Sequence, residues 1–301
     1  MALERVIRYA AGMSAQIDPF HAISISGLAH RLKAEGRQVI HMEFGQPSTG
    51  APKAAVAAAH AVLDTDAMGY WESAPLKARI CRHYAETYGV TVEPAQITLT
   101  CGASPGLVLA LSATFSPSDV IAMARPGYVA YRNTVKALHM VPLEIACGAE
   151  TRFQPPGGGA PPPPRPAGGW GPPSPPPAGV IVASPANPTG TIIPGPELEA
   201  IARVCAERGI RIVSDEIYHG LGYTEPAHSM LEYAPDAIVV NSFSKYFSMA
   251  GWRLGWLIVP RAEASRAVAY MGALFLTAPS LAQHAALVAM DCRDELEGHL
   301  A

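Results

Sequence analysis

One stretch decides the fold, and it reads GVIVASPANPTGTIIPGPELEAIARVCAERGIRIVSDEIY (residues 179–218). It begins with an apolar run at 179–183 and contains a second apolar run at 210–214. Between them, Pro196 opens a segment whose apolar residues recur with helical spacing, and Gly209 closes it. Strand, helix and strand in this order predict a βαβ unit, in which the two strands lie parallel.

Further short apolar runs extend this unit into a larger sheet. They are 96–100, 120–124, 237–241 and 254–259. Several of them are apolar at nearly every position, which indicates strands covered by helices on both faces. We therefore expect an α/β fold with a mostly parallel central sheet sandwiched by helices. Such sheets bind their ligands beyond the carboxyl ends of the strands.

The composition argues against several classes of protein. The chain has 301 residues and a formal net charge of −3, and a nucleic-acid partner needs Lys and Arg clustered on one face, so we expect none. No apolar run approaches the length of a membrane span, and charges at Glu4, Arg5 and Arg8 interrupt the apolar residues of the amino terminus. We expect a cytoplasmic protein with no membrane contact.

The cysteines and histidines form no recognisable metal or disulfide pattern. The five cysteines are odd in number, widely spaced and without a CxxC pair, which favours free thiols in a reducing compartment. The ten histidines show no HExxH spacing. We therefore predict no metal site.

Proline and glycine are concentrated in one place. Residues 155–177 hold 12 prolines and 6 glycines, and a packed core cannot be built from such a stretch. We interpret 153–178 as a surface insertion without regular structure. A PxxP ligand for a partner domain is the functional alternative, but a tolerated loop expansion is the favoured interpretation.

The turn Gly102-Ala103-Ser104-Pro105-Gly106, between an apolar strand and an apolar helix, has two interpretations. It matches the G-x-S-x-G elbow of serine hydrolases, with His219 or His228 as a possible base further along the chain. In that elbow the residue after the serine donates its backbone N–H to the oxyanion, and a proline has none. The helix amino terminus remains a good anion site, because Ala103 and Ser104 still offer their N–H groups.

A lysine follows the apolar strand at 237–241, in the segment SFSKYFSMAGWR (242–253). Lys245 is either a surface residue or an amine whose pKa is lowered by partial burial, so that it can attack a carbonyl. Other polar residues that follow neighbouring strands are Asn187, Asp215, Tyr218 and Arg253. Because such ends meet at one edge of a sheet, we favour the reactive amine.

The lysine segment resembles that of the class I and II aminotransferases, which are pyridoxal 5'-phosphate enzymes of fold type I. The resemblance implies that Lys245 carries the cofactor as a Schiff base and moves a proton during catalysis. It implies that Asp215 pairs with the pyridine nitrogen, and that Asn187 and Tyr218 hydrogen-bond the phenolic oxygen. Tyr128, in the sequence Arg-Pro-Gly-Tyr, resembles the aromatic residue that stacks on the cofactor ring.

The same resemblance implies a phosphate site. Its contacts come from the backbone of Ala103 and Ser104, the hydroxyls of Ser242 and Ser244, and the guanidinium group of Arg253, whose planar fork suits a phosphate.

Two earlier segments also match the family. Phe-Gly-Gln-Pro at 44–47 resembles the loop whose glycine, here Gly45, meets the substrate together with Asn187. Gly-Tyr-Trp-Glu at 69–72 resembles the segment whose tyrosine, here Tyr70, reaches the phosphate of a neighbouring subunit. The resemblance therefore implies a homodimer that acts on an amino acid and a 2-oxo acid.

The matched motifs run from Phe44 to Arg253 and predict three parts. Residues 1–43 are an amino-terminal segment belonging to a small domain or dimer arm, 44–279 the large cofactor-binding domain, and 280–301 the start of a carboxyl-terminal small domain that is largely missing. No arginine here matches the family residue that binds the substrate carboxylate, so we expect a cofactor site with impaired turnover.

Other functions remain open at this point. The same lysine and aspartate serve lyases, decarboxylases and cyclopropane-carboxylate-forming synthases of this fold, since the cofactor carries the chemistry. A non-catalytic aminotransferase-like module is a further alternative.

Overall fold

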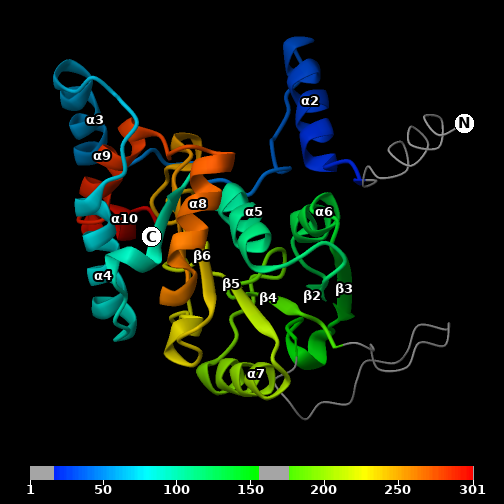
Figure 1. Ribbon diagram of the computed structural model, residues 1–301. Helices are drawn as coiled ribbons and strands as arrows, with labels where there is room; N and C mark the ends of the chain where they lie inside the picture. The colour runs from blue at the N-terminus through cyan, green and yellow to red at the C-terminus, as the bar shows by residue number, and fades with distance from the viewer. Residues whose placement is uncertain (1–16, 156–175, 301) are drawn as a thin grey trace, which may run out of the picture.

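The computed structural model describes residues 17–155 and 176–300 (Figure 1). Its helices are α2 (His21–Ala34), α3 (Lys53–Thr65), α4 (Ala74–Tyr88), α5 (Ala103–Thr114), α6 (Val129–Ala137), α7 (Gly195–Arg208), α8 (Ala264–Leu274), α9 (Ser280–Ala289) and α10 (Arg293–Gly298). Its strands are β1 (Ile97–Thr100), β2 (Val120–Arg125), β3 (Val141–Ala146), β4 (Gly179–Ala183), β5 (Arg211–Asp215), β6 (Ile238–Ser242) and β7 (Gly255–Ile258). Most of the proline and glycine insertion, 156–175, lies outside the described residues.

Within the described residues the strands form one seven-stranded sheet with the order β1-β7-β6-β5-β4-β2-β3. The pairs from β6 to β3 are all parallel, and β7 alone runs antiparallel to both of its neighbours. The expectation of a mostly parallel sheet is confirmed. Because β7 runs in reverse, its first residue lies at the edge where the other strands end.

The βαβ unit that decided the fold is present as predicted. Helix α7 lies between β4 and β5, and it ends at Gly209, whose φ of 66° is left-handed and suits glycine. Its apolar residues at 198, 201, 202 and 205 are buried. The periodicity therefore identified the face that packs on the sheet.

The sequence did not predict strand β3. It lies at the edge of the sheet, contains Pro142 and Glu144, and is only partly buried, so it lacks a continuous apolar run. Edge strands tolerate proline because one side of their backbone needs no partner. The helix after the glycine turn begins at Ala103, directly after Gly102.

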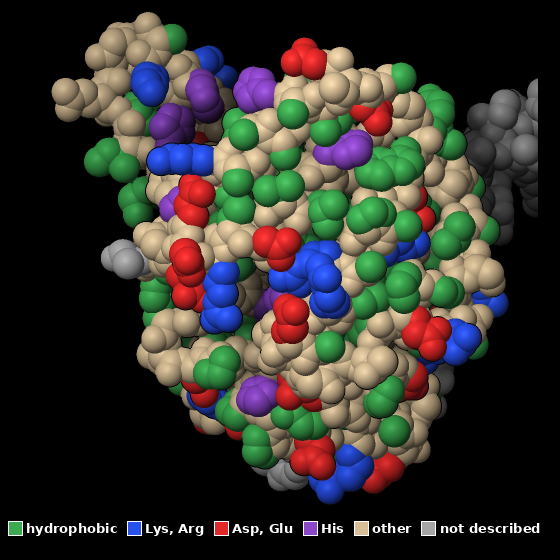
Figure 2. Space-filling model, turned by 90° about the vertical axis from the view of Figure 1, so that its left-hand side faces the viewer, with side chains coloured by type: hydrophobic (Ala, Val, Ile, Leu, Met, Phe, Trp, Pro, Cys, Tyr) green, Lys and Arg blue, Asp and Glu red, His purple; other side chains and the backbone are tan. Residues whose placement is uncertain are grey.

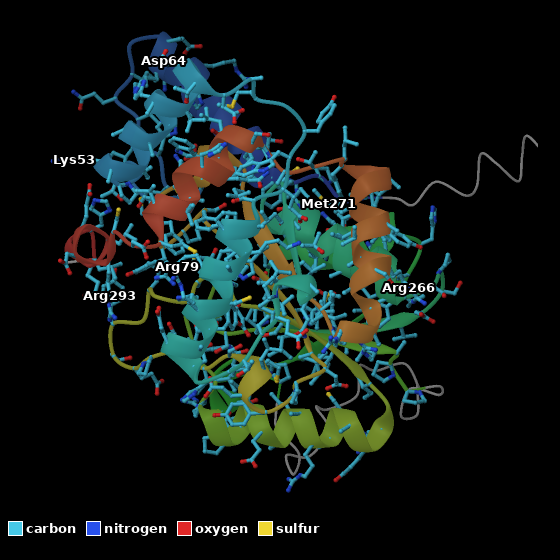
Figure 3. All side chains as sticks on the ribbon, turned by 60° about the vertical axis from the view of Figure 1, so that its left-hand side comes forward. Lys53, Asp64, Arg79, Arg266, Met271 and Arg293 are labelled. Carbon is cyan, nitrogen blue, oxygen red and sulfur yellow. The ribbon has the colours of Figure 1, made fainter. Side chains whose placement is uncertain are left out.

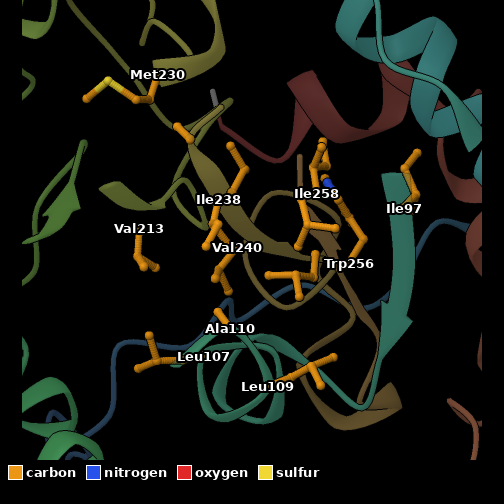
Figure 4. Packing of buried hydrophobic residues seen from close by; sticks show 14 of the residues in the cluster. Ile97, Leu107, Leu109, Ala110, Val213, Met230, Ile238, Val240, Trp256 and Ile258 are labelled. Atoms are coloured by element: carbon orange, nitrogen blue, oxygen red, sulfur yellow. The ribbon is translucent and has the colours of Figure 1, made fainter. Parts of the chain in front are cut away.

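Helices cover both faces of the sheet. Val240 and Asn241 are adjacent on β6 and point to opposite faces. A Cβ added to Gly106 of α5 would lie 3.3 Å from Val240 Cγ1, so α5 packs on the first face, as Figure 4 shows for its neighbour Ala110. Trp256, which pairs with Asn241, donates a hydrogen bond of 3.3 Å to the Tyr84 hydroxyl of α4 on the second face.

Helix α4 also contacts α9, which in turn packs on α3, so these helices form a group at one side of the molecule, with α10 nearby (Figure 1). Arg79 of α4 donates hydrogen bonds to Asp291 (2.6 Å) and to the Met290 carbonyl (3.1 Å), which joins α4 to the end of α9 (Figure 3). Acidic and basic side chains are interspersed over this face (Figure 2). Helix α2, by contrast, projects from the body and leaves Ile23 and Ile25 exposed.

No helix in the described residues combines the length and the apolar character needed to cross a membrane. These residues also contain no group of three or more His, Cys, Asp or Glu side chains placed to hold a metal ion.

Candidate active site

The polar residues that follow the strands meet at one edge of the sheet. Asp215 is the last residue of β5, Lys245 follows β6, and Asn187 follows β4. Arg253 precedes β7, and the reversed direction of that strand brings it to the same edge. We call Asn187, Asp215, Tyr218, Lys245 and Arg253 the strand-end cluster.

Lys245 is half-buried at the centre of this edge. Its Nζ donates a hydrogen bond of 2.5 Å to the Gly45 carbonyl and lies 5.6 Å from the centroid of the Tyr218 ring. Burial lowers the pKa of the Lys245 amine, the positive charge of Arg253 lowers it further, and Asp215 partly opposes the change. The lowered pKa increases the fraction of neutral amine, which is the nucleophilic form.

Asp215 is a buried carboxylate, 7% exposed, with neutral hydrogen-bond donors on both oxygens. Tyr131 donates its hydroxyl to Oδ2 at 2.6 Å, and the Ile217 backbone N–H donates to Oδ1 at 3.1 Å. Burial raises the pKa of Asp215, and these two hydrogen bonds act in the opposite direction. A cation beside this carboxylate would therefore favour its charged form.

Two aromatic hydroxyls lie close to Asp215. Tyr218 accepts a hydrogen bond of 3.1 Å from the Asn187 amide. Tyr128 precedes α6, and its ring makes an edge-on contact with that of Tyr131 at 5.4 Å between centroids. Burial and the charge of Asp215 raise the pKa of both Tyr128 and Tyr218, so both hydroxyls stay protonated and can donate.

An anion cradle lies at the amino terminus of α5. Gly102 precedes the helix with a φ of 99°, and a Cβ at that position would overlap the guanidinium group of Arg253. Glycine is favoured there by the backbone angle, and a side chain at this position would push the guanidinium group aside. Arg253 is held by the carbonyls of Ala250 (2.9 Å) and Cys101 (3.4 Å). Its charge adds to the free N–H groups of the first helical turn, which include those of Ala103 and Ser104.

Ser242 and Ser244, the two serines that flank Phe243 before Lys245, are more buried than Arg253. Ser242 is the last residue of β6, and its Oγ accepts a hydrogen bond of 3.1 Å from the backbone N–H of Ser244. Both side chains are buried. Their hydroxyl protons can still be directed to an anion, because a serine oxygen accepts and donates at once.

The other two predicted residues lie on segments outside the sheet. Gly45 is exposed, but its carbonyl contacts Lys245. The Tyr70 side chain is 85% exposed, although its neighbours are fixed: Ser280 Oγ donates to the Gly69 carbonyl (2.7 Å), and Gln283 donates to the Trp71 carbonyl (2.9 Å). We call Gly69–Trp71 the pinned segment.

The serine hydrolase alternative is not supported. Pro105 lies in the first turn of α5, as expected, and gives no N–H to an oxyanion. Both ring nitrogens of His219 have other partners, the Tyr88 hydroxyl at 2.6 Å and the Ser184 carbonyl at 2.9 Å. His228 interacts with Glu232 at 3.1 Å. Neither histidine is placed to activate Ser104.

The described residues fit a phosphorylated pyridine aldehyde. The cradle at Gly102 suits its phosphate, the buried Asp215 carboxylate suits a protonated ring nitrogen, and the Lys245 amine suits a carbonyl carbon. These three features lie at or just after the ends of different strands, and the sheet brings them to one edge.

Comparison with known proteins agrees with this reading. The sequence profile of the aminotransferase class I and II family matches residues 37–300. The chain belongs to this family. It is a pyridoxal-phosphate-dependent aminotransferase of fold type I.

Relatives of this aminotransferase include valine–pyruvate aminotransferase from Mycobacterium tuberculosis, 40% identical over 96% of this chain and 74% of the relative. An aspartate aminotransferase from Geobacillus stearothermophilus is 30% identical over 91% of this chain and 70% of the relative. A crystal structure of an aminotransferase from Mycobacterium tuberculosis superposes with a TM-score of 0.86 at 39% identity, covering 94% of this chain and 73% of the other.

Sequence reasoning missed the hydrogen-bond partners that stand behind the active site of this aminotransferase. Tyr131 lies in the first turn of α6, three positions after Tyr128, which precedes the helix, so their spacing could have indicated that the two rings meet. Glu216 and His219 flank the predicted Tyr218, yet both are buried and point away from it into a polar network. No local pattern distinguishes these residues from surface polar residues.

Proposed function

We propose that this aminotransferase transfers the amino group of an L-amino acid to a 2-oxo acid, with a short aliphatic donor and pyruvate as the favoured pair. The observation that carries the proposal is the convergence of a half-buried Lys245 amine, a buried Asp215 carboxylate and the anion cradle at one sheet edge. The favoured pair is supported by the relative named valine–pyruvate aminotransferase, at 40% identity.

Lys245 is the residue that holds the cofactor and moves the proton at the substrate Cα. Bound pyridoxal phosphate supplies a ring that accepts the electron pair released when a bond to Cα breaks. The lowered pKa of Lys245 favours the neutral amine, which can take up the proton of the Cα–H bond. Asp215 would pair with the protonated ring nitrogen, and its two neutral donors fix the orientation of the carboxylate.

The remaining cluster residues orient the ring. Asn187 and Tyr218, already in contact at 3.1 Å, would donate hydrogen bonds to the phenolic oxygen. Tyr128 would pack on the ring face, and Tyr131 supports the Tyr128 ring from the side. The phosphate is held by Arg253, by the N–H groups of Ala103 and Ser104, and by the hydroxyls of Ser242 and Ser244.

Substrate contacts come from the cluster and from the segment before α3. Gly45 meets the substrate through its backbone, and its carbonyl already lies against Lys245. Asn187 contributes its amide as a second contact. The side-chain hydrogen bond between Thr49 and Ser248, 2.7 Å long, supports this placement because it joins the segment to the loop after Lys245.

The functional unit is a homodimer in which Tyr70 of one chain contacts the phosphate bound to the other. The pinned segment supports this arrangement, because its backbone is fixed by α9 while the Tyr70 ring faces outward. The corresponding division of the chain is 1–43, 44–279 and 280–301, with the cofactor held by the middle part.

A reducing compartment such as the cytoplasm suits this chain. All five cysteines are free thiols, and burial raises the pKa of each of them, which makes them poorly reactive.

The test is a single-turnover measurement on the cofactor-loaded protein. Its visible absorbance is followed after mixing with L-valine, with L-aspartate or with D-valine as the stereochemical control. We expect the fastest bleaching with L-valine, and recovery of the starting spectrum on adding pyruvate. Release of ammonia or carbon dioxide in place of recovery would instead indicate a lyase or a decarboxylase.

A further inference from the structure

The two loops that carry Asn187 and Tyr218 are joined at two points. On the cofactor side, the Asn187 amide donates to the Tyr218 hydroxyl at 3.1 Å. Behind them, His219 Nε2 lies 2.9 Å from the Ser184 carbonyl. Ser184 precedes Asn187 by three residues, and His219 directly follows Tyr218. The second link therefore sets the distance between the loops that carry the first.

The hydrogen bonds determine the tautomer of His219. A carbonyl oxygen only accepts, so Nε2 must carry the proton that is donated to Ser184. Burial lowers the pKa of His219 to about 4, which keeps the ring neutral and leaves Nδ1 without a proton. Nδ1 then accepts the hydrogen bond from the Tyr88 hydroxyl at 2.6 Å. Burial raises the pKa of Tyr88, so this donor keeps its proton.

The surroundings of His219 leave its ring little freedom. The residue is 7% exposed, and its ring centroid lies 5.5 Å from that of Tyr88 on α4. A carboxylate oxygen of Glu216 lies 3.8 Å from Nδ1. Three further titratable groups interact electrostatically with this ring. They are His83 of α4 and, beyond the turn, His228 and Glu232. A buried ring that turned would lose both hydrogen bonds at once.

We propose that His219 is a positioning residue, which fixes the spacing of the Asn187 amide and the Tyr218 hydroxyl at the phenolic oxygen of the cofactor. The inference rests on the proposed function, which places these two donors at that oxygen. Without the His219 contact, the loop that begins at Ser184 is released from the turn at Tyr218, and small displacements of catalytic groups are costly.

The test uses two amides of different length in place of the ring. The glutamine amide of His219→Gln reaches the position of Nε2, whereas the asparagine amide of His219→Asn stops short of the Ser184 carbonyl. The readout is the pH at which the visible absorbance of the cofactor-loaded protein changes, without substrate. Hydrogen-bond donors to the phenolic oxygen stabilise its negative charge, and they thereby lower the proton affinity of Lys245 Nζ when that atom is bonded to the cofactor. Loss of a donor should therefore raise the pH at which the absorbance changes.

We expect His219→Asn to shift the absorbance midpoint upward by at least about 0.5 pH units, and His219→Gln to restore most of the wild-type value. Asn187→Ala serves as the reference for complete loss of one donor. Tyr88→Phe removes the hydrogen bond to Nδ1 and keeps the one to Ser184, so its midpoint should remain near the wild-type value. Thermal midpoints of all four apoproteins separate loss of stability from loss of positioning.

Three outcomes would overturn parts of this account. If Asn187→Ala shifts the absorbance midpoint but His219→Asn does not, the positioning role of His219 is contradicted and the role of Asn187 is not. Equal shifts in the asparagine and glutamine variants would show that the Ser184 contact is not the cause. An unshifted Asn187→Ala would instead refute the assignment of Asn187 in the proposed function, and the role of His219 with it.

A second measurement needs no variant and no cofactor. Nitrogen-15 spectra of the histidine rings in the apoprotein report which nitrogen carries the proton. We expect the Nε2–H form of His219 to persist well below pH 6. A proton on Nδ1 in the neutral ring, or a charged ring at pH 6, would overturn the proposal even if the variants failed to fold.

Discussion

The strand-end cluster and the pinned segment are both fixed in place, but they present their side chains in opposite ways. Asp215 is 7% exposed and hydrogen-bonded on both oxygens, whereas Tyr70 is 85% exposed between two carbonyls that α9 holds. A buried polar group must find its partners within the fold. A fixed but outward side chain, by contrast, is free to contact a second chain, which is the role proposed for Tyr70. The two regions should therefore respond differently to substitution.

The largest effect is expected from Lys245→Ala, which removes the amine proposed both to hold the cofactor and to move the proton. We expect a loss of single-turnover rate of at least about 10³-fold, within the range seen for general acid–base groups combined with nucleophilic catalysis. Stopped-flow absorbance at saturating cofactor measures it. Lys33→Ala, an exposed residue of α2, is the control. Wild-type rates in Lys245→Ala would contradict the proposed role of this lysine.

Glu216→Gln tests the polar network behind the cluster through stability. Glu216 accepts hydrogen bonds from Ser229 Oγ (3.0 Å) and the Met230 N–H (2.9 Å) and is buried, and burial raises its pKa from 4.5 to about 7. The folded protein thus keeps a proton that the unfolded chain has released. The stabilisation from this group is complete below pH 4.5 and is lost as the pH rises through 7.

Glutamine cannot ionise, so the variant should gain stability relative to wild type between pH 5 and 8. The gain is about 3 kcal/mol, because the pKa of Glu216 is about 7 in the folded protein and 4.5 in the unfolded chain. Urea unfolding across this pH range measures it, with the exposed Glu225→Gln as control. A stability difference that does not change with pH would show that Glu216 is ionised throughout.

Gly102→Ala tests the anion cradle. The added Cβ is strained at a φ of 99° and overlaps the Arg253 guanidinium group, which must move away. We expect cofactor affinity to fall about 10- to 100-fold, the cost of such backbone strain and of a displaced cation. Equilibrium titration of the apoprotein measures it. Gly251→Ala is a matched control, because nothing lies within 4 Å of its added Cβ, and an equal loss there would argue against the cradle.

Tyr131→Phe removes one donor from Asp215 and leaves the packing of the ring. The hydrogen bond lowers the pKa of Asp215, so its loss should raise that pKa and move the acidic limb of the kcat/KM profile to higher pH. The expected loss at low pH is about tenfold. Tyr128→Phe keeps the bond to Asp215 and should leave the limb in place. An unshifted limb in Tyr131→Phe would indicate that another group controls it.

The smallest effect is expected from Tyr70→Phe. The hydroxyl has no role in the fold of one chain, so thermal stability should be unchanged, while cofactor affinity should fall only a few-fold. The loss should appear at protein concentrations where two chains associate, and vanish on dilution. Sedimentation and cofactor titration over the same concentrations test this, with Tyr223→Phe as the exposed control. If the loss of cofactor affinity does not depend on protein concentration, Tyr70 acts within its own chain and not on a second chain.

Much of this site could be predicted because its chemistry lies in short, local motifs. The residues at 187, 215, 218, 245 and 253 each follow or precede an apolar strand, and the sheet gathers them at one edge. Strand β3 escaped prediction because an edge strand needs no continuous apolar run. Tyr131 and His219 escaped it because a buried polar partner is defined by what lies opposite it in space.

The sequence by itself determined the class of fold, because apolar periodicity and glycine and proline positions act over a few residues. Its resemblance to the aminotransferases identified the cofactor and predicted the residues proposed to hold it. Only the tertiary structure decided how those residues are held. The reversed β7 brings Arg253 to Gly102, α6 brings Tyr131 to Asp215, and α4 brings Tyr88 to His219. These contacts join residues distant in the chain, and burial in a common core gives them their geometry and shifts their pKa values.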